Sequence, residues 1–155
     1  MRKVYSVIAW IIAGGVVVQA ASIALGLGGM LSYVQDGGVI DKAVVESGQQ
    51  AYTGDVGFPI HELVGGMVIP IAAVALLVVS FFVKVRGARM WAAIVFGLVA
   101  IQALLGYSIA DLPYAGLVHG ANALAVLLAS VYAALLVRRS KRAGVEEPAS
   151  DAVTA

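Results

Sequence analysis

The chain has 155 residues, of which 61% are hydrophobic and 12% are charged, and its net charge is +1 at neutral pH. Soluble domains average about half apolar and about a quarter charged residues, so this composition indicates a membrane protein. The absence of cysteine excludes disulfides, thiolate metal ligands, covalent heme attachment and cysteine nucleophiles. The sequence contains no glycine-rich phosphate loop, no HExxH zinc motif and no basic arm for nucleic acid.

Four apolar runs are long enough to cross a bilayer, which takes about 20 residues of helix. They show no period-2 alternation, so we expect helices rather than barrel strands. In chain order the predicted spans are Val4–Leu27, Phe58–Val83, Trp91–Ala110 and Pro113–Val137. The first run follows "MRK" as in a signal peptide, but it is longer than a typical one, so we expect it to be retained. The sequence therefore predicts an all-α integral membrane four-helix bundle over residues 1–142.

The basic residues fall on one side of this predicted bundle. Nine of the ten precede the first span, join the second to the third, or follow the fourth: Arg2, Lys3, Lys84, Arg86, Arg89, Arg138, Arg139, Lys141 and Arg142. The other side is mostly acidic, with Lys42 as its only base. The positive-inside rule then predicts that both termini are cytoplasmic.

Two segments lie outside the predicted spans. An outer segment of about thirty residues, Gly28–Gly57, connects the first two spans. Within it, "DKAVVESGQQAY" is typical of a short amphipathic helix resting on the outer surface. The stretch 143–155, "AGVEEPASDAVTA", is polar and rich in small residues, which predicts a disordered cytoplasmic tail.

The only two histidines of the chain lie inside spans. His61 is about one turn into the second span and His119 about one and a half turns into the fourth, so both sit at similar depth in the outer third. Ionisable residues in a span are costly and usually face the bundle interior, which makes both functional candidates. Each has a glycine one turn away on its own face, Gly65 or Gly116. Such faces leave room for a flat apolar group, or for two helices to approach closely.

An internal repeat relates the two halves of the chain. Gln19 and Gln102 each stand about eight residues before the outer end of a span, and each is followed by a Leu-Gly pair. Each outgoing helix then leads past Pro59 or Pro113 to a returning helix with its histidine near the outer end. The pattern predicts two pseudo-repeated helical hairpins that bring the histidines face to face.

Two facing histidines favour bis-histidine ligation of a b-type heme, because bundle interiors build cofactor sites from facing helices. Neutral imidazoles need no compensating anion in an apolar setting. An alternative is that each histidine only hydrogen-bonds a neighbouring helix, through Gln19, Gln102 or Asn122. A zinc or copper site is less favoured, since it would need help from Glu62 or Asp111 to complete the ligand set.

The residues around His61 complete the expectations for the second span. Its face is expected to continue inward through Val68 and Ala72. Glu62 lies about 100° around the helix from His61 and is interpreted as an interfacial carboxylate, with a contact near a heme propionate or proton transfer at a quinone or substrate site as alternatives. Pro70 is expected to kink the helix. Four outer tyrosines form an aromatic belt or supply hydrogen-bond donors: Tyr33, Tyr52, Tyr107 and Tyr114.

The sequence also resembles a known family. The stretch "IQALLGYSIADLPYAGLVHGANALAVLLASVYAALLVRR", residues 101–139, resembles the closing hairpin of one half of heme A synthase. "FPIHELVGG" resembles the start of the partner helix, and the spacing of 58 residues between the histidines is similar to that of the family's paired histidines. Heme A synthases are two such four-helix bundles in tandem, and the resemblance covers one bundle. A group of uncharacterised bacterial four-helix membrane proteins looks similar too.

The resemblance implies that His61 and His119 are axial heme ligands. The family's catalytic half has a glutamate three residues before its first histidine and an arginine just after it, where this chain has Phe58 and Glu62. The family's outer-loop cysteines are also missing. The chain therefore resembles the half that holds heme b more than the half that oxidises heme O.

Together these observations predict a multi-pass protein of a bacterial plasma membrane. It would hold heme b through His61 and His119, with Gly65 and Gly116 beside it, for electron transfer or heme handling. Two alternatives stay open, a half-size heme A synthase-like oxidase that works as a dimer and a non-heme accessory subunit, so the sequence does not decide whether the protein is an enzyme. The expected partners are the lipid bilayer and a second copy or a larger respiratory complex, with no nucleic acid.

Overall fold

The computed structural model describes the backbone of residues 1–146 and the side chains of residues 1–139. Within residues 1–146 the regular structure is entirely helical. Four helices are long and apolar enough to cross a membrane, and they cover Arg2–Gln35, Gly57–Ser80, Ala88–Ser108 and Ala115–Arg139. The predicted all-α, multi-pass membrane architecture is confirmed at this level.

The helices in chain order are α1 (Arg2–Gln35), α2 (Lys42–Ser47), α3 (Gly57–Leu63), the π-helical segment η1 (Val64–Val68), α4 (Ile69–Ser80), α5 (Ala88–Ser108) and α6 (Ala115–Glu146). The elements α3, η1 and α4 form one continuous helix, which is the second span. The fourth helix continues through Glu146, past the predicted end of the span and into the predicted tail. Residues 147–155 of that tail lie outside the described residues.

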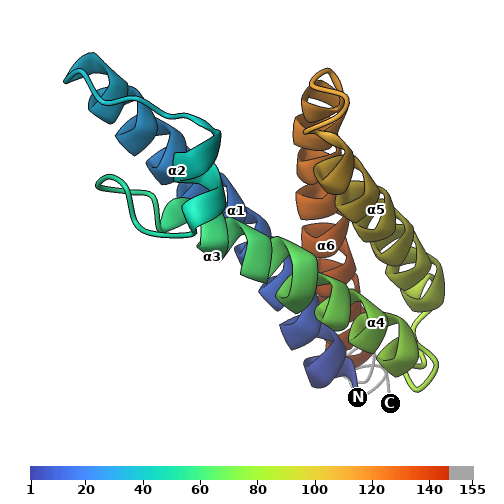
Figure 1. Ribbon diagram of the computed structural model, residues 1–155. Coiled ribbons are helices and arrows are strands. Elements are labelled where there is room, and N and C mark those ends of the chain that lie inside the picture. Colours follow the sequence, from blue (N-terminus) through green and yellow to red (C-terminus); the bar gives the residue numbers. More distant parts are fainter. Residues whose placement is uncertain (147–155) are drawn as a thin grey trace, which may run out of the picture.

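Each long helix packs against two neighbours. Helix α1 packs against α6 and against the second span, and α5 packs against α6 and α4. In cross-section the order is therefore α1, α4, α5, α6, with the second span diagonally opposite α6. In Figure 1 the pair α1 and α4 crosses the pair α5 and α6 near the N-terminus, and the two pairs diverge toward the end that carries α2.

The buried apolar core lies in the half of the bundle that contains the N-terminus. All four spans contribute to it, for example with Ile12, Leu76, Val95 and Val126. Many of its other members are alanines, which let helix backbones approach closely in a membrane. Beyond Val126 toward the outer end, the facing surfaces of the two helix pairs are less deeply buried, because the pairs diverge there.

Helix α1 extends about two turns beyond Leu27, the predicted outer end of the first span. Its 34 residues span about 51 Å, whereas the hydrocarbon core is about 30 Å thick. The outer connection packs along the extra turns: Gly29 lies against the main-chain oxygen of Thr53, and the rings of Tyr33 and Tyr52 stack at 5.6 Å. The expectation that the helix ends near Leu27 was wrong, because these contacts hold the following residues helical.

The short outer helix falls inside the stretch for which it was predicted. Helix α2 covers Lys42–Ser47, and the Asp41 side chain accepts a hydrogen bond from the Val44 amide at 2.9 Å. This side chain caps the helix because it satisfies an amide that has no partner within the helix.

Candidate functional site: a facing pair of histidines

The two histidines face each other across the bundle. His61 lies on α3 and His119 on α6, which belong to diagonally opposite spans. Their ring centroids are 6.3 Å apart and their planes are inclined by 47°. Both residues are half-buried. The structure therefore brings together the two residues that the sequence singled out.

Each imidazole is held by a main-chain oxygen of the preceding long helix. The Nδ1 atom of His61 lies 3.1 Å from the main-chain oxygen of Gln19, and the Nδ1 atom of His119 lies 3.1 Å from that of Gln102. A carbonyl oxygen only accepts, so Nδ1 carries the proton in each bond and Nε2 of the neutral ring keeps its lone pair. Metal-binding histidines have this arrangement, in which the second nitrogen is tied to a carbonyl or carboxylate.

The first hairpin adds a second bond between the same two residues. The Nε2 amide of Gln19 donates to the main-chain oxygen of His61 at 2.7 Å. The Gln19 side chain passes directly over Gly65, where a Cβ atom would lie 2.7 Å from Oε1 of the glutamine. Gly65 was predicted to leave room for a flat group or for close approach of two helices, and in the structure it makes room for the side chain of Gln19 on α1.

In the second hairpin, the Gln102 side chain is hydrogen-bonded by Asn122 of the neighbouring helix α6. The Nδ2 amide of Asn122 donates to Oε1 of Gln102 at 2.7 Å and to the main-chain oxygen of Leu98 at 2.9 Å. The His119 ring lies against Gly106, where a Cβ atom would be 3.1 Å from Cε1 of the ring. Gly106 was not among the predicted site residues, although its Leu-Gly pair was part of the repeat.

Gly116, the second glycine predicted at the site, borders open space. No heavy atom lies within 4 Å of the position that a Cβ atom would take there. The His119 helix therefore has open space at Gly116, about one turn toward the outer end from the histidine.

The separation of the rings suits one metal ion bound between them. A metal–imidazole bond is about 2.0–2.1 Å long and each nitrogen is about 1.1 Å from its ring centroid, so two collinear ligands place their centroids about 6.3 Å apart. The observed separation is 6.3 Å. Among the described residues, no group of three or more His, Cys, Asp or Glu side chains is placed to hold a metal ion.

The histidine pair lies at the outer edge of the deeply buried core. The deeply buried core ends at Val126, about two turns inward of His119. From there outward the two helix pairs diverge (Figure 1), and the imidazoles of His61 and His119, from diagonally opposite spans, have ring centroids 6.3 Å apart. These two imidazoles are the groups that would hold a heme in this part of the fold.

The other polar candidates do not join the pair. Glu62 and Asp111 are exposed, and Glu62 follows His61 directly on the helix. Tyr107 and Tyr114 are 71% and 85% exposed near the outer ends of α5 and α6. The Tyr107 hydroxyl lies beside Gly66, 3.2 Å from the position of a Cβ atom there.

The outer connection holds the remaining predicted tyrosines. Desolvation raises the pKa of Tyr52, and the Asp55 carboxylate beside it raises the pKa further. The ring of Tyr52 stacks on Tyr33 of α1, so both belong to the packing of the outer connection. The Tyr52 hydroxyl also forms a hydrogen bond with the Asp55 side chain.

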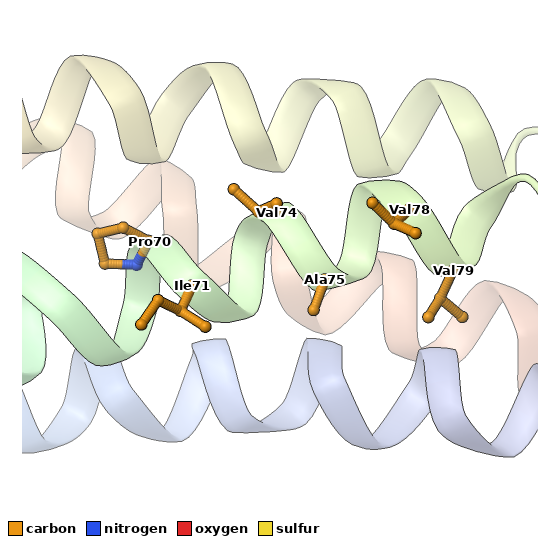
Figure 2. A pocket seen from close by; sticks show the side chains of 6 residues that line it. All are labelled: Pro70, Ile71, Val74, Ala75, Val78 and Val79. Atoms are coloured by element: carbon orange, nitrogen blue, oxygen red, sulfur yellow. The ribbon is translucent and has the colours of Figure 1, made fainter.

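An apolar hollow of about 510 Å³ lies elsewhere, along the outer surface of α4. Figure 2 shows it between α5 and α1, and its lining consists of Pro70, Ile71, Val74, Ala75, Val78 and Val79. It contains no ionisable or hydrogen-bonding side chain. We interpret it as a lipid-contact surface that is separate from the histidine pair.

Comparison of the chain with protein families, curated proteins and solved structures gives no match in any of the three. The resemblance to one half of heme A synthase stays a prediction from the quoted residues.

Proposed function

We propose that this protein is a membrane b-type cytochrome-like protein that holds one heme between His61 and His119, for electron transfer or heme handling. One observation carries the proposal: both rings donate Nδ1–H to a carbonyl, which leaves two Nε2 lone pairs on rings spaced for a common metal ion. Iron with both axial positions filled by imidazole favours one-electron transfer over oxygen binding.

The residues around the pair have separate tasks in this proposal. The main-chain oxygens of Gln19 and Gln102 fix the tautomer and the direction of each ring and raise the basicity of Nε2. Tyr107 and Tyr114, exposed at the outer ends of their helices, supply hydroxyl donors for the heme carboxylates.

The proposed orientation places both termini in the bacterial cytoplasm and the histidine pair toward the outer face of the plasma membrane. The distribution of charge supports it, because the basic residues cluster at the end with the N-terminus and the acidic residues at the other. The equal Nδ1–carbonyl distances in the two hairpins support their origin as pseudo-repeats.

Heme binding is tested by purifying the protein in detergent and recording a reduced-minus-oxidised spectrum with heme quantitation. We expect about one heme per chain and the sharp alpha band of a six-coordinate b-type cytochrome. His61→Ala and His119→Ala should each abolish this spectrum, whereas Glu62→Ala, beside the site but exposed, should keep it. Absence of any alpha band after heme supplementation would refute the proposal.

A further inference from the structure

The second span changes from α-helical to π-helical geometry a few residues after His61, on the inward side of the histidine. The segment η1, Val64–Val68, is π-helical, and the Ile69 amide donates to the main-chain oxygen of Val64, five residues back. A π-bulge adds one residue to a helix and so rotates everything beyond it by about 100°. Pro70 follows directly and has no amide hydrogen, so the Gly66 carbonyl loses its regular α-helical partner.

The inner part of the span defines which face points into the bundle. The buried residues of α4 are Ile69, Ala73, Leu76 and Ser80, which share one face of a regular helix. Extending that face outward at 100° per residue places Glu62 about 20° from Ile69 and His61 about 80° from it. A regular helix would therefore turn the glutamate, and not the histidine, toward the bundle interior.

The observed contacts follow a different register. On the side that packs against α1, Ile69 lies against Gly15, His61 bonds Gln19, and Gly57 lies against Ser22. Gly57 is buried, His61 is half-buried and Glu62 is exposed. Gly57 and His61 thus each lie one residue earlier than the regular helix requires, and the π segment supplies that one residue. The ring of Phe58, beside Gly57, also lies against Gly26 of α1.

We propose that the π-bulge at Val64–Val68 is the positioning device of this site, because it turns His61 instead of Glu62 toward His119. The reciprocal bonds between Gln19 and His61 lock the shifted register, since the ring reaches the Gln19 carbonyl only when His61 faces α1. Without the bulge an acidic side chain would face a neutral imidazole in the bundle interior. The consequence for iron ligation rests on the proposed heme function, whereas the register itself does not.

The register can be measured without heme, because the chain has no cysteine. In membranes containing the full chain, the pair His61→Cys with His119→Cys should react with a short bifunctional thiol reagent several-fold faster than the pair Glu62→Cys with His119→Cys. Removal of Gly66, which takes one residue out of the bulge, should reverse this preference. The same preference in both backgrounds would overturn the proposal.

If the chain without Gly66 does not accumulate in the membrane, the register is measured in the full-length chain instead. Single cysteines at positions 57 to 62 are each combined with His119→Cys and cross-linked in the full-length chain. Cross-linking should peak at His61. A peak at Glu62 would overturn the proposal.

The consequence for ligation has its own test in the heme-loaded protein. Removal of Gly66 should abolish the bis-histidine spectrum, and adding Glu62→His to the shortened chain should restore it. In the full chain, Glu62→His should fail to rescue His61→Ala. Rescue in the full chain, or an unchanged spectrum after the removal, contradicts the proposal. If the parent chain binds no heme, the proposed function fails while the cross-linking still decides the register.

Discussion

Each of the two hairpins turns one histidine toward the bundle interior, but the helix geometry that does so differs between them. In the second hairpin, His119 and the buried Val126 are seven residues apart on a regular helix, so plain periodicity turns the histidine inward. In the first, His61 and the buried Ile69 are eight residues apart, and only the π segment brings them to one face. The Nδ1–carbonyl distances at the two histidines are therefore equal although one helix contains a π-helical segment and the other is regular near its histidine.

The support of the two rings differs as well. The side-chain amide of Gln19 donates a hydrogen bond to the main-chain oxygen of His61. The side chain of Gln102 instead accepts a hydrogen bond from Asn122. The first hairpin thus ties ring and helix together at one residue, and the second distributes the support over two. Changes in the two hairpins should accordingly differ in size.

The largest effect is expected from filling the glycine under the second ring. Gly106→Leu would drive a side chain into His119, because even a Cβ atom there lies 3.1 Å from the ring. We expect loss of the bis-histidine spectrum with the protein still inserted in the membrane. Gly97→Leu, on the same helix but with open space around it, is the matched control and should bind heme normally. Normal heme binding by the Gly106 variant would contradict the geometry of the second hairpin.

Filling the corresponding glycine of the first hairpin should act indirectly. Gly65→Ala would displace the Gln19 side chain, whose Oε1 lies 2.7 Å from the new Cβ position, but it leaves the His61 ring in reach of its carbonyl. We expect weaker heme retention in detergent instead of complete loss. Dissociation of heme to an apoprotein acceptor measures this, and complete loss of heme would show that the two hairpins are equally sensitive.

Loss of the glutamine amides should have smaller, unequal effects on stability. Gln19→Leu removes the donor to the His61 backbone, and we expect it to lower the free energy of unfolding by about 1 kcal/mol. Gln102→Leu should cost about half as much, because Asn122 keeps its bond to Leu98. Unfolding in mixed micelles compares the two variants. A larger loss for Gln102→Leu would reverse our interpretation of the two hairpins.

The smallest effect concerns the outer connection, which is long in the first hairpin alone. The pKa of Tyr52 is raised above its ordinary value in the folded protein, so its contribution to stability is present below that value and is lost as the pH rises through the higher folded pKa. We expect the outer connection to loosen only in strongly alkaline solution, followed by tyrosinate absorbance and limited proteolysis. Tyr52→Phe should remove this pH dependence, and an unchanged profile would assign the transition to another group.

The sequence was sufficient for the features that depend on composition and spacing. The length of the apolar runs located the four spans. The similar depth of the two ionisable histidines indicated that their side chains would meet. The interhelix role expected of Gln19 and Gln102 is confirmed, through the amide of Gln19 and the contact of Gln102 with Asn122. These features survive small errors in helix boundaries, because hydropathy and depth change slowly along a helix.

The register of the second span could not be obtained in the same way. The expectation that the His61 face continues through Val68 and Ala72 was wrong at Val68, which is 42% exposed. Ala72 is half-buried and packs against the core, whose fully buried members here are Ile69 and Ala73. The prediction assumed regular periodicity throughout, and one extra residue in the π segment shifts every later position. The extension of α1 was missed because it depends on tertiary contacts with the outer connection.

The central claim is that His61 and His119 bind one iron from opposite sides. Low-temperature electron paramagnetic resonance of the oxidised protein tests it most directly, because bis-imidazole iron is low-spin. We predict a low-spin ferric heme signal in the parent chain and its loss in both His61→Ala and His119→Ala. A chain without heme, or a low-spin signal that persists unchanged in either variant, would contradict the account.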